Sequence, residues 1–189
     1  MGNGSTRMLG YKQGWIVLIT RSQSVQLGLT LPELLIGIAI LGILASVGLP
    51  GFQTWMVDTK IRTAAESIQS GLQRARAEAV SRNTGIEFIL GTGSSWVVRV
   101  ANPVTIIESR SSNEGSKNVT GTTEPAGATT ITYNSFGQIA ANADASPTFT
   151  RVTLAASGSS KLLSVTVNAG GSVKMCNPAL ATGSHITAC

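Results

Sequence analysis

Histidine, cysteine and charged residues are scarce in this 189-residue chain. With one histidine and two cysteines, a metal centre built from such ligands would lack most of its donors. Charged residues make up 12% and aromatic residues 5%, whereas glycine occurs 21 times, which suits a β-rich, turn-rich domain. The 42% hydrophobic content excludes a disordered polar chain. We expect one domain with additions, and no metal or cofactor.

Acidic residues are absent from the first 28 positions, where Arg7, Lys12 and Arg21 lie. Residues 29–189 contain eleven Lys and Arg and nine Asp and Glu, so without the first 28 positions the net charge falls from +5 to +2. The basic isoelectric point of the whole chain therefore overstates the basicity of residues 29–189. Their small positive charge is only a weak indication of general nucleic-acid binding. Translation could begin at Met1 or at Met8, and the sequence does not decide between them.

A catalytic constellation is also missing from the sequence. His185 lies in a Gly/Ser-rich tail without a companion ligand, which predicts a solvent-exposed loop residue. Gly170-Gly171 predicts a turn before a short strand, and no serine forms a nucleophile elbow. Trp96 lies in an alternating segment and is expected in the core. We predict that the protein is not an enzyme, with an anchored periplasmic enzyme as the alternative.

One long apolar run, LTLPELLIGIAILGILASVGL at 29–49, contains Glu33 as its only ionisable residue. As a helix it would nearly cross a bilayer core of about 30 Å. The upstream cations would remain cytoplasmic, and the chain after Leu49 would face the other side. A secretory signal would need a cleavage site after the run, where Ala45-Ser46-Val47 is a poor candidate. A plain signal anchor is the other alternative, and Trp55 suits an interfacial aromatic anchor.

A carboxylate such as Glu33 is unfavourable in this apolar segment unless another group stabilises it. A carboxylate there costs about 2.5–3.5 kcal/mol on insertion scales, although the first helical turn lowers that cost. A free amine at a new N-terminus would be a good partner. Cleavage after Gly28 would place such an amine on Leu29, one helical turn from Glu33.

The segment GLTLPELL at 28–35 resembles the type IV prepilin processing motif. The resemblance implies cleavage between Gly28 and Leu29 by a prepilin peptidase, and N-methylation of Leu29. It also implies that Glu33 binds the Leu29 amine of a neighbouring subunit during assembly. Leu29 replaces the usual Phe, and Pro32 replaces a common Ile but is acceptable in a first helical turn. In this family a kink or melted stretch is implied at Pro50.

Downstream, small and apolar residues recur at helical spacing from Ile61 to Ala79. We predict one helix from about Leu31 to Arg82, ended by Asn83-Thr84-Gly85. The chain then alternates with period two, and 109–127 is expected to be a mobile loop. The result is an α+β fold, in which the helix packs on an antiparallel β-sheet as a type IV pilin-like roll. The predicted strands are 85–90, 96–101, 105–110, 129–134, 148–155, 162–168 and 172–175.

Three segments narrow the resemblance to the GspH/FimT family of minor pilins and pseudopilins. They are IRTAAESIQSGLQRARAEAVSRNTGIEF, SFGQIA at 135–140, and LLSVTVNAGGSVKMC with a second cysteine at the chain end. The predicted organisation is a leader peptide (1–28), a transmembrane and filament-core helix (29–50), an amphipathic half-helix (51–84) and a periplasmic β domain (85–189). The implied partners are prepilin peptidase, other pilin or pseudopilin subunits and the inner membrane.

Cys176 and Cys189 predict a disulfide in an exported domain, the alternative being two unpaired thiols. Some members of the family are DNA receptors in natural transformation, with a Gly-Arg-x-Arg run before the first of these cysteines. Here the run is Gly171-Ser172-Val173-Lys174, so one Arg is Ser and the other is Lys. A DNA-binding minor pilin is therefore the alternative function, and a type II secretion pseudopilin is a third interpretation. The cations available for phosphate contacts are Lys174, Lys161 and Arg151.

Overall fold

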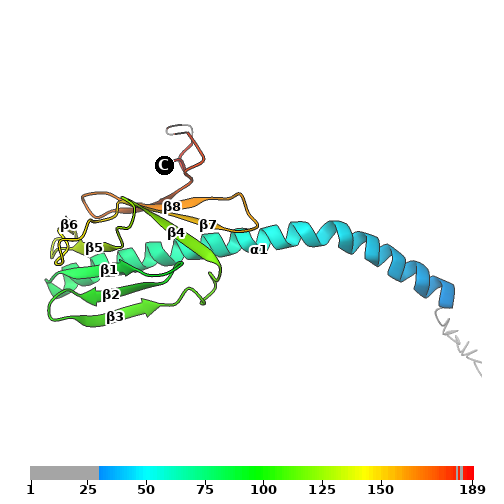
Figure 1. Ribbon diagram of the computed structural model, residues 1–189, viewed down its shortest axis with the longest axis horizontal. Coiled ribbons are helices and arrows are strands. Elements are labelled where there is room, and N and C mark those ends of the chain that lie inside the picture. The colour runs from blue at the N-terminus through cyan, green and yellow to red at the C-terminus, as the bar shows by residue number, and fades with distance from the viewer. Residues whose placement is uncertain (1–29, 182, 184) are drawn as a thin grey trace, which may run out of the picture. The chain divides into compact units, whose positions relative to one another are not determined.

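The computed structural model describes residues 30–181, 183 and 185–189. The predicted leader, the Gly28–Leu29 bond and the methylation position at Leu29 lie outside the described residues. The chain divides into two compact units, Met1–Gly42 and Ile43–Cys189, each considered by itself below. Within the described residues the elements are one helix followed by nine strands (Figure 1).

Helix α1 extends over Leu31–Arg82, as the sequence predicted. In the described residues it is the one helix long and apolar enough to cross a membrane, judged by length and composition. Large apolar side chains of this half of the helix, among them Leu31, Leu41 and Leu49, are exposed. Helix α1 is continuous through Pro50, and a kink or melted stretch at that residue stays a prediction.

The second half of α1 carries the predicted apolar stripe, and every member of it is fully buried. Gly71 lies on this stripe beneath two aromatic rings. A Cβ atom there would approach Cε2 of Phe88 to 2.8 Å and Cε2 of Trp96 to 2.9 Å. The smallest residue therefore lets the sheet come close to the helix at this point. The buried stripe consists of Ile61, Ala64, Ala65, Ile68, Leu72, Ala75 and Ala79.

The helix ends where the Asn-Thr-Gly signal predicted. Asn83 has a φ of 50°, in the left-handed region that Asn tolerates better than most residues. The Asn83 N–H donates to the Val80 carbonyl (3.4 Å), and the Thr84 N–H donates to the Ala79 carbonyl (3.3 Å). This pair of bonds is a Schellman motif, which satisfies the last carbonyls of the helix.

Two antiparallel sheets flank this part of the helix (Figure 1). The first has the order β3-β2-β1-β5-β6, and the second has the order β4-β7-β8-β9. The fold class predicted from the sequence is confirmed, whereas the division into two sheets was not predicted. The strands of the first sheet are β1 (Ile86–Leu90), β2 (Trp96–Val100), β3 (Thr105–Arg110), β5 (Thr130–Tyr133) and β6 (Ile139–Ala140). Those of the second are β4 (Val119–Glu124), β7 (Arg151–Ala156), β8 (Leu163–Val167) and β9 (Val173–Cys176).

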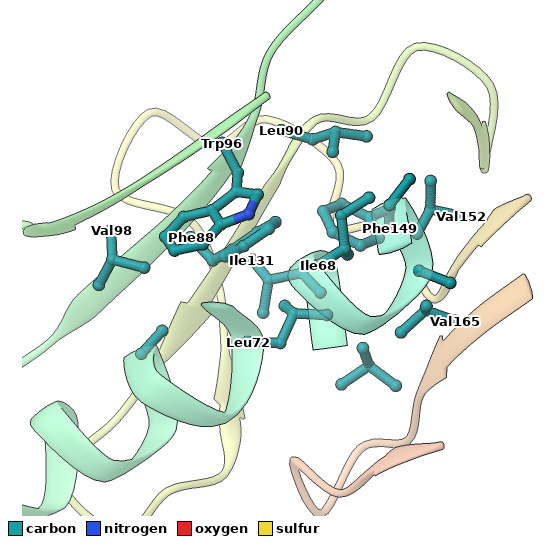
Figure 2. Close-up of a cluster of buried hydrophobic side chains, with 14 of the residues drawn as sticks. Ile68, Leu72, Phe88, Leu90, Trp96, Val98, Ile131, Phe149, Val152 and Val165 are labelled. Carbon is teal, nitrogen blue, oxygen red and sulfur yellow. The ribbon is translucent and has the colours of Figure 1, made fainter. Parts of the chain in front are cut away.

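One core joins the helix to both sheets (Figure 2). The Phe88 ring lies between Trp96 and Phe149, with centroid distances of 5.7 and 6.2 Å. The Trp96 indole N–H donates to Ser67 Oγ at 2.8 Å, so its polar atom is satisfied inside the core. The prediction that Trp96 is a core residue is confirmed.

The prediction of a mobile loop over 109–127 is wrong for its second half, which forms β4. This strand pairs with β7 from Val119↔Ala156 to Glu124↔Arg151. Alternation of exposed threonines with more buried positions gives the segment period two, and Val119 anchors it in the core. The Ser, Gly and Thr content masked that pattern, because these residues also dominate turns.

Candidate functional site

The first turn of α1 combines an apolar surface with one carboxylate. Glu33 is the only charged residue from Thr30 to Val57, and the side chains around it are exposed. Thr30 precedes the helix, and its carbonyl accepts the Leu34 N–H at 3.1 Å. Glu33 makes no ion pair or hydrogen bond with another residue that the structure describes.

At this position an unpaired carboxylate is able to bind a cation. The unpaired N–H groups of a first helical turn favour a negative charge, so Glu33 is less costly there than in mid-helix. An amine is the simplest group that could neutralise it in apolar surroundings. The predicted amine, on Leu29, belongs to the part of the chain outside the described residues.

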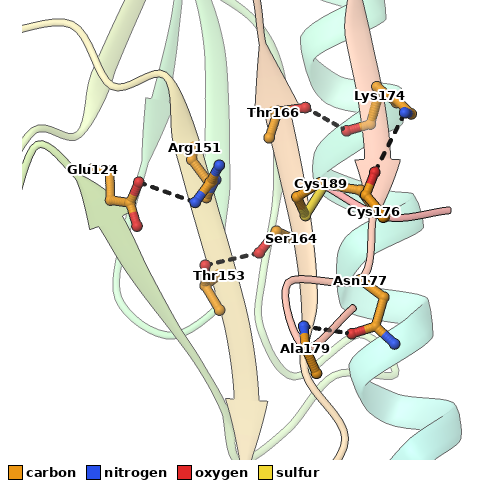
Figure 3. The surroundings of a disulfide bond; sticks show 11 residues. Glu124, Arg151, Thr153, Ser164, Thr166, Lys174, Cys176, Asn177, Ala179 and Cys189 are labelled. Carbon is orange, nitrogen blue, oxygen red and sulfur yellow. Dashed lines mark hydrogen bonds and ion pairs between the residues drawn. A yellow bond between two sulfur atoms is a disulfide. The ribbon is translucent and has the colours of Figure 1, made fainter. Parts of the chain in front are cut away.

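The C-terminus is fixed by a disulfide between Cys176 and Cys189, which confirms the prediction (Figure 3). Cys176 ends β9, and Ala188 next to the second cysteine forms a bridge to Asn177. The Asn177 N–H donates to the Thr187 carbonyl at 2.7 Å. The last residues therefore lie against the end of the second sheet and are held there by a covalent bond.

The three cations predicted for DNA do not gather into one cluster. Arg151 and Lys174 both pair in register with Thr166 of β8, so they lie on one row of the sheet. Lys161 lines a hollow of about 280 Å³ that Cys176 and the C-terminal segment also line. Neither Arg151 nor Lys174 lines this hollow.

Two of these cations already have acidic partners, and Figure 3 shows the pair of Arg151 with Glu124. Arg151 is 3.3 Å from Glu124, and Lys161 is 3.8 Å from Asp58. Lys174 is exposed, and its ammonium group donates to the Ala188 carbonyl at 3.5 Å. Among the three, only Lys174 lacks an acidic partner within the described residues.

The arginines near the end of α1 divide into two roles. Arg74 and Arg82 both pair with Glu78, the former at 2.9 Å. The hydrogen bond from Arg82, with the positive charges of both arginines, holds the pKa of Glu78 below its usual value. Glu66, one turn or more upstream on the same helix, pairs with Arg62 at 2.8 Å.

Arg76 holds two turns together, a role that the sequence analysis missed. Its Nε donates to the Gly137 carbonyl at 3.0 Å, and one terminal nitrogen approaches the Gly170 carbonyl at 3.5 Å. Beneath these turns lies Tyr133, whose hydroxyl has no hydrogen-bond partner among the described residues. Burial raises the pKa of this phenol well above its usual value. The segments SFGQIA and NAGG therefore meet at one structural junction.

The histidine of the C-terminal segment has no companion metal ligands among the described residues. His185 is exposed, and its Nδ1 lies 2.7 Å from the Thr187 hydroxyl oxygen. Within the residues described, no group of three or more His, Cys, Asp or Glu side chains could hold a metal ion.

Two family models match the chain. The model described as type II transport protein GspH matches residues 64–171, more than half of the chain. The prokaryotic N-terminal methylation motif matches residues 23–49, which include Gly28, Leu29 and Glu33. The search of curated proteins found no match.

Solved structures of one protein resemble the fold. Two crystal structures of the type IV minor pilin FimU from Pseudomonas aeruginosa strain PAO1 match the chain. The first matches with a TM-score of 0.52 and 19% identity, covering 66% of this chain and 93% of FimU. The second has a TM-score of 0.49 and 18% identity, covering 65% and 98%. At this identity the first match shows the shared fold and nothing further.

Proposed function

Because this chain belongs to the GspH family of type II transport proteins, we propose that it is a membrane-anchored minor pilin or pseudopilin. Pilin-like proteins of this fold are structural subunits and not enzymes. The observation that carries the proposal is the solitary Glu33 in the first turn of an exposed apolar helix. That turn lies within the matched N-terminal methylation motif.

Processing is the first step of the proposed mechanism. A prepilin peptidase hydrolyses the Gly28–Leu29 bond on the cytoplasmic side and releases the leader. The new α-amine of Leu29 receives a methyl group and keeps its ability to carry a positive charge. The apolar half of α1 stays in the membrane as an anchor until the subunit enters a filament.

Assembly is the second step. The apolar half-helices of successive subunits pack together, and the Glu33 carboxylate neutralises the Leu29 ammonium of a neighbour. The pair matters because the filament core is dry, where either charge alone would be costly. Pairing at one position also sets the register between subunits. The same scheme serves a type IV pilus and a type II secretion pseudopilus.

The charges of the leader and the disulfide support the proposed location. Arg7, Lys12 and Arg21 would keep the leader in the cytoplasm, so the inner membrane holds α1 and the β domain faces the periplasm. A disulfide is expected to persist in that oxidising compartment.

Mass spectrometry of the mature N-terminus tests the proposal directly. We expect the protein purified from its host to begin at Leu29 and to carry an N-methyl group. A Gly28→Val chain should keep its leader, because a bulky side chain would stand where the peptidase approaches the bond. A native chain that still begins at its initiator methionine, or that has lost the apolar segment, would contradict the proposal.

The DNA-receptor alternative makes a different prediction. Arg151 and Lys161 are already paired, so Lys174 alone cannot supply the several phosphate contacts that tight binding needs. We expect a fragment of residues 53–189 to give no salt-dependent gel shift of duplex DNA at micromolar concentration, with or without Lys174→Ala. A shift in the unmodified fragment that weakens with salt and disappears in the variant would instead favour a receptor.

A further inference from the structure

Three bulky side chains, Phe52, Trp55 and Met56, cluster on α1 just after Pro50. Their spacing places them on one face of the helix, and the Phe52 and Trp55 rings lie 5.8 Å apart. They are 55%, 60% and 42% exposed, respectively, so about half of each side chain remains uncovered. An aromatic and thioether cluster of this size is costly to leave in water.

The β domain begins to contact α1 immediately after this cluster. Ser159 donates a hydrogen bond to the Asp58 carboxylate, and the Lys161 ammonium lies 3.8 Å from the same group. A Cβ atom on Gly158 would lie 3.8 Å from Val57. The β7–β8 turn therefore marks where the domain first covers the helix, and the cluster lies just outside that cover.

The cluster also lies between apolar and charged sequence. Residues 31–49 would extend about 28 Å as a helix, close to the thickness of a bilayer core. The first charged residues after Glu33 are Asp58 and Lys60, and Lys60 makes no ion pair with the described residues. The three side chains thus occupy the short stretch where an apolar span would give way to water.

The indole of Trp55 distinguishes a lipid interface from a dry protein contact. Its N–H has no acceptor among the described residues, whereas the N–H of buried Trp96 is bonded to Ser67. Packing against the apolar half-helix of another subunit would cover the ring but leave that N–H unsatisfied. The headgroup region of a bilayer offers apolar contact to the ring and phosphate or carbonyl oxygens to the N–H.

We propose that Phe52, Trp55 and Met56 form an interfacial anchor that binds the headgroup region of a phospholipid bilayer. The β7–β8 turn at 157–161 then stands at the membrane surface, with Lys60, which has no ion pair among the described residues, facing the lipid phosphates. The anchor fixes the depth of the subunit before it is withdrawn into a filament. This inference rests on the proposed membrane anchoring of α1.

Quenching of Trp55 fluorescence by brominated lipids tests the inference. The full chain carrying Trp15→Phe is reconstituted into phosphatidylcholine vesicles brominated near either the carbonyl or the methyl end of the acyl chains. The same chain with Trp55→Phe added gives the contribution of Trp96, which is subtracted. We expect the Trp55 signal to be quenched more strongly by the shallow bromines than by the deep bromines.

A tryptophan in mid-span provides the matched control. Ile40→Trp in the Trp15→Phe, Trp55→Phe background should be quenched more by the deep bromines, because Ile40 lies near the middle of the apolar run. A Trp55 signal quenched with the same depth dependence as the Ile40→Trp position, or not quenched at all, would overturn the interfacial anchor. Flotation of the vesicles is a separate measurement. A chain that does not float with lipid would overturn the membrane anchoring itself, and with it the anchor.

Discussion

A Glu33→Leu chain should still enter the membrane but should no longer be incorporated into filaments. Leucine removes an insertion cost of about 2.5–3.5 kcal/mol, so insertion should improve. Assembly should fail, because the Leu29 ammonium of a neighbour would be buried without its partner. Breaking a buried pair in this way costs about 3–5 kcal/mol, which lowers the association constant by more than about a hundredfold. Membrane fractionation and immunodetection in sheared filaments measure the two steps separately.

Glu66→Gln is the matched control on the same helix. Glu66 is exposed and pairs with Arg62 at 2.8 Å, a surface contact worth about 0.3–0.5 kcal/mol. Its loss should leave both insertion and incorporation unchanged. Incorporation of Glu33→Leu at the level of the unmodified chain would show that the carboxylate does not pair during assembly. Loss of Glu33→Leu from the membrane would show that the residue serves insertion instead.

The helix could be predicted from sequence because its signals are local. The apolar run, the stripe from Ile61 to Ala79 and the Asn83 stop lie along one continuous segment, and the observed helix has the predicted ends. Several strands were also recognisable, because apolar and polar residues alternate along them, as in β7, where Val152 and Leu154 are buried. The disulfide followed from the number of cysteines and the expected compartment.

What the sequence could not show depends on contacts between distant segments. β4 is rich in Thr and Gly, and only pairing with β7 distinguishes it from a loop. The division into two sheets follows from pairings that residue types do not encode. The role of Arg76 is similar, since its acceptors Gly137 and Gly170 are backbone carbonyls 61 and 94 residues away.

For the candidate DNA-binding cations, too, the sequence does not show which contacts they make in the fold. Lys174, Lys161 and Arg151 share a charge sign, and the sequence alone presents them as one group. The acids that neutralise Arg151 and Lys161, Glu124 and Asp58, come from other strands or from the helix. Counting cations therefore overestimates the surface that is available to phosphates.

Gly171→Ala should destabilise the β domain more than other glycine substitutions in its turns. Gly171 has a φ of 78°, which costs an L-residue about 1–2 kcal/mol. Its new Cβ would also overlap the Gly137 carbonyl oxygen, and it would lie 3.2 Å from Cε1 of Tyr133. That oxygen cannot retreat freely, because it accepts the hydrogen bond from Arg76. We expect a loss of about 3–4 kcal/mol in the free energy of unfolding, measured by urea denaturation of residues 53–189.

Two other glycines separate the contributions to this loss. Gly170 has no left-handed conformation, and its Cβ would meet Asn168 at an ordinary 3.4 Å, so Gly170→Ala should change stability by less than about 0.5 kcal/mol. Gly127 has a φ of 79° but open space around it, so Gly127→Ala should cost the conformational term alone, about 1 kcal/mol. The excess of Gly171→Ala over Gly127→Ala then measures the contact between the two turns. Equal losses at Gly171 and Gly127 would show that the SFGQIA and NAGG turns can separate without cost. Arg76 would in that case not hold the junction rigid.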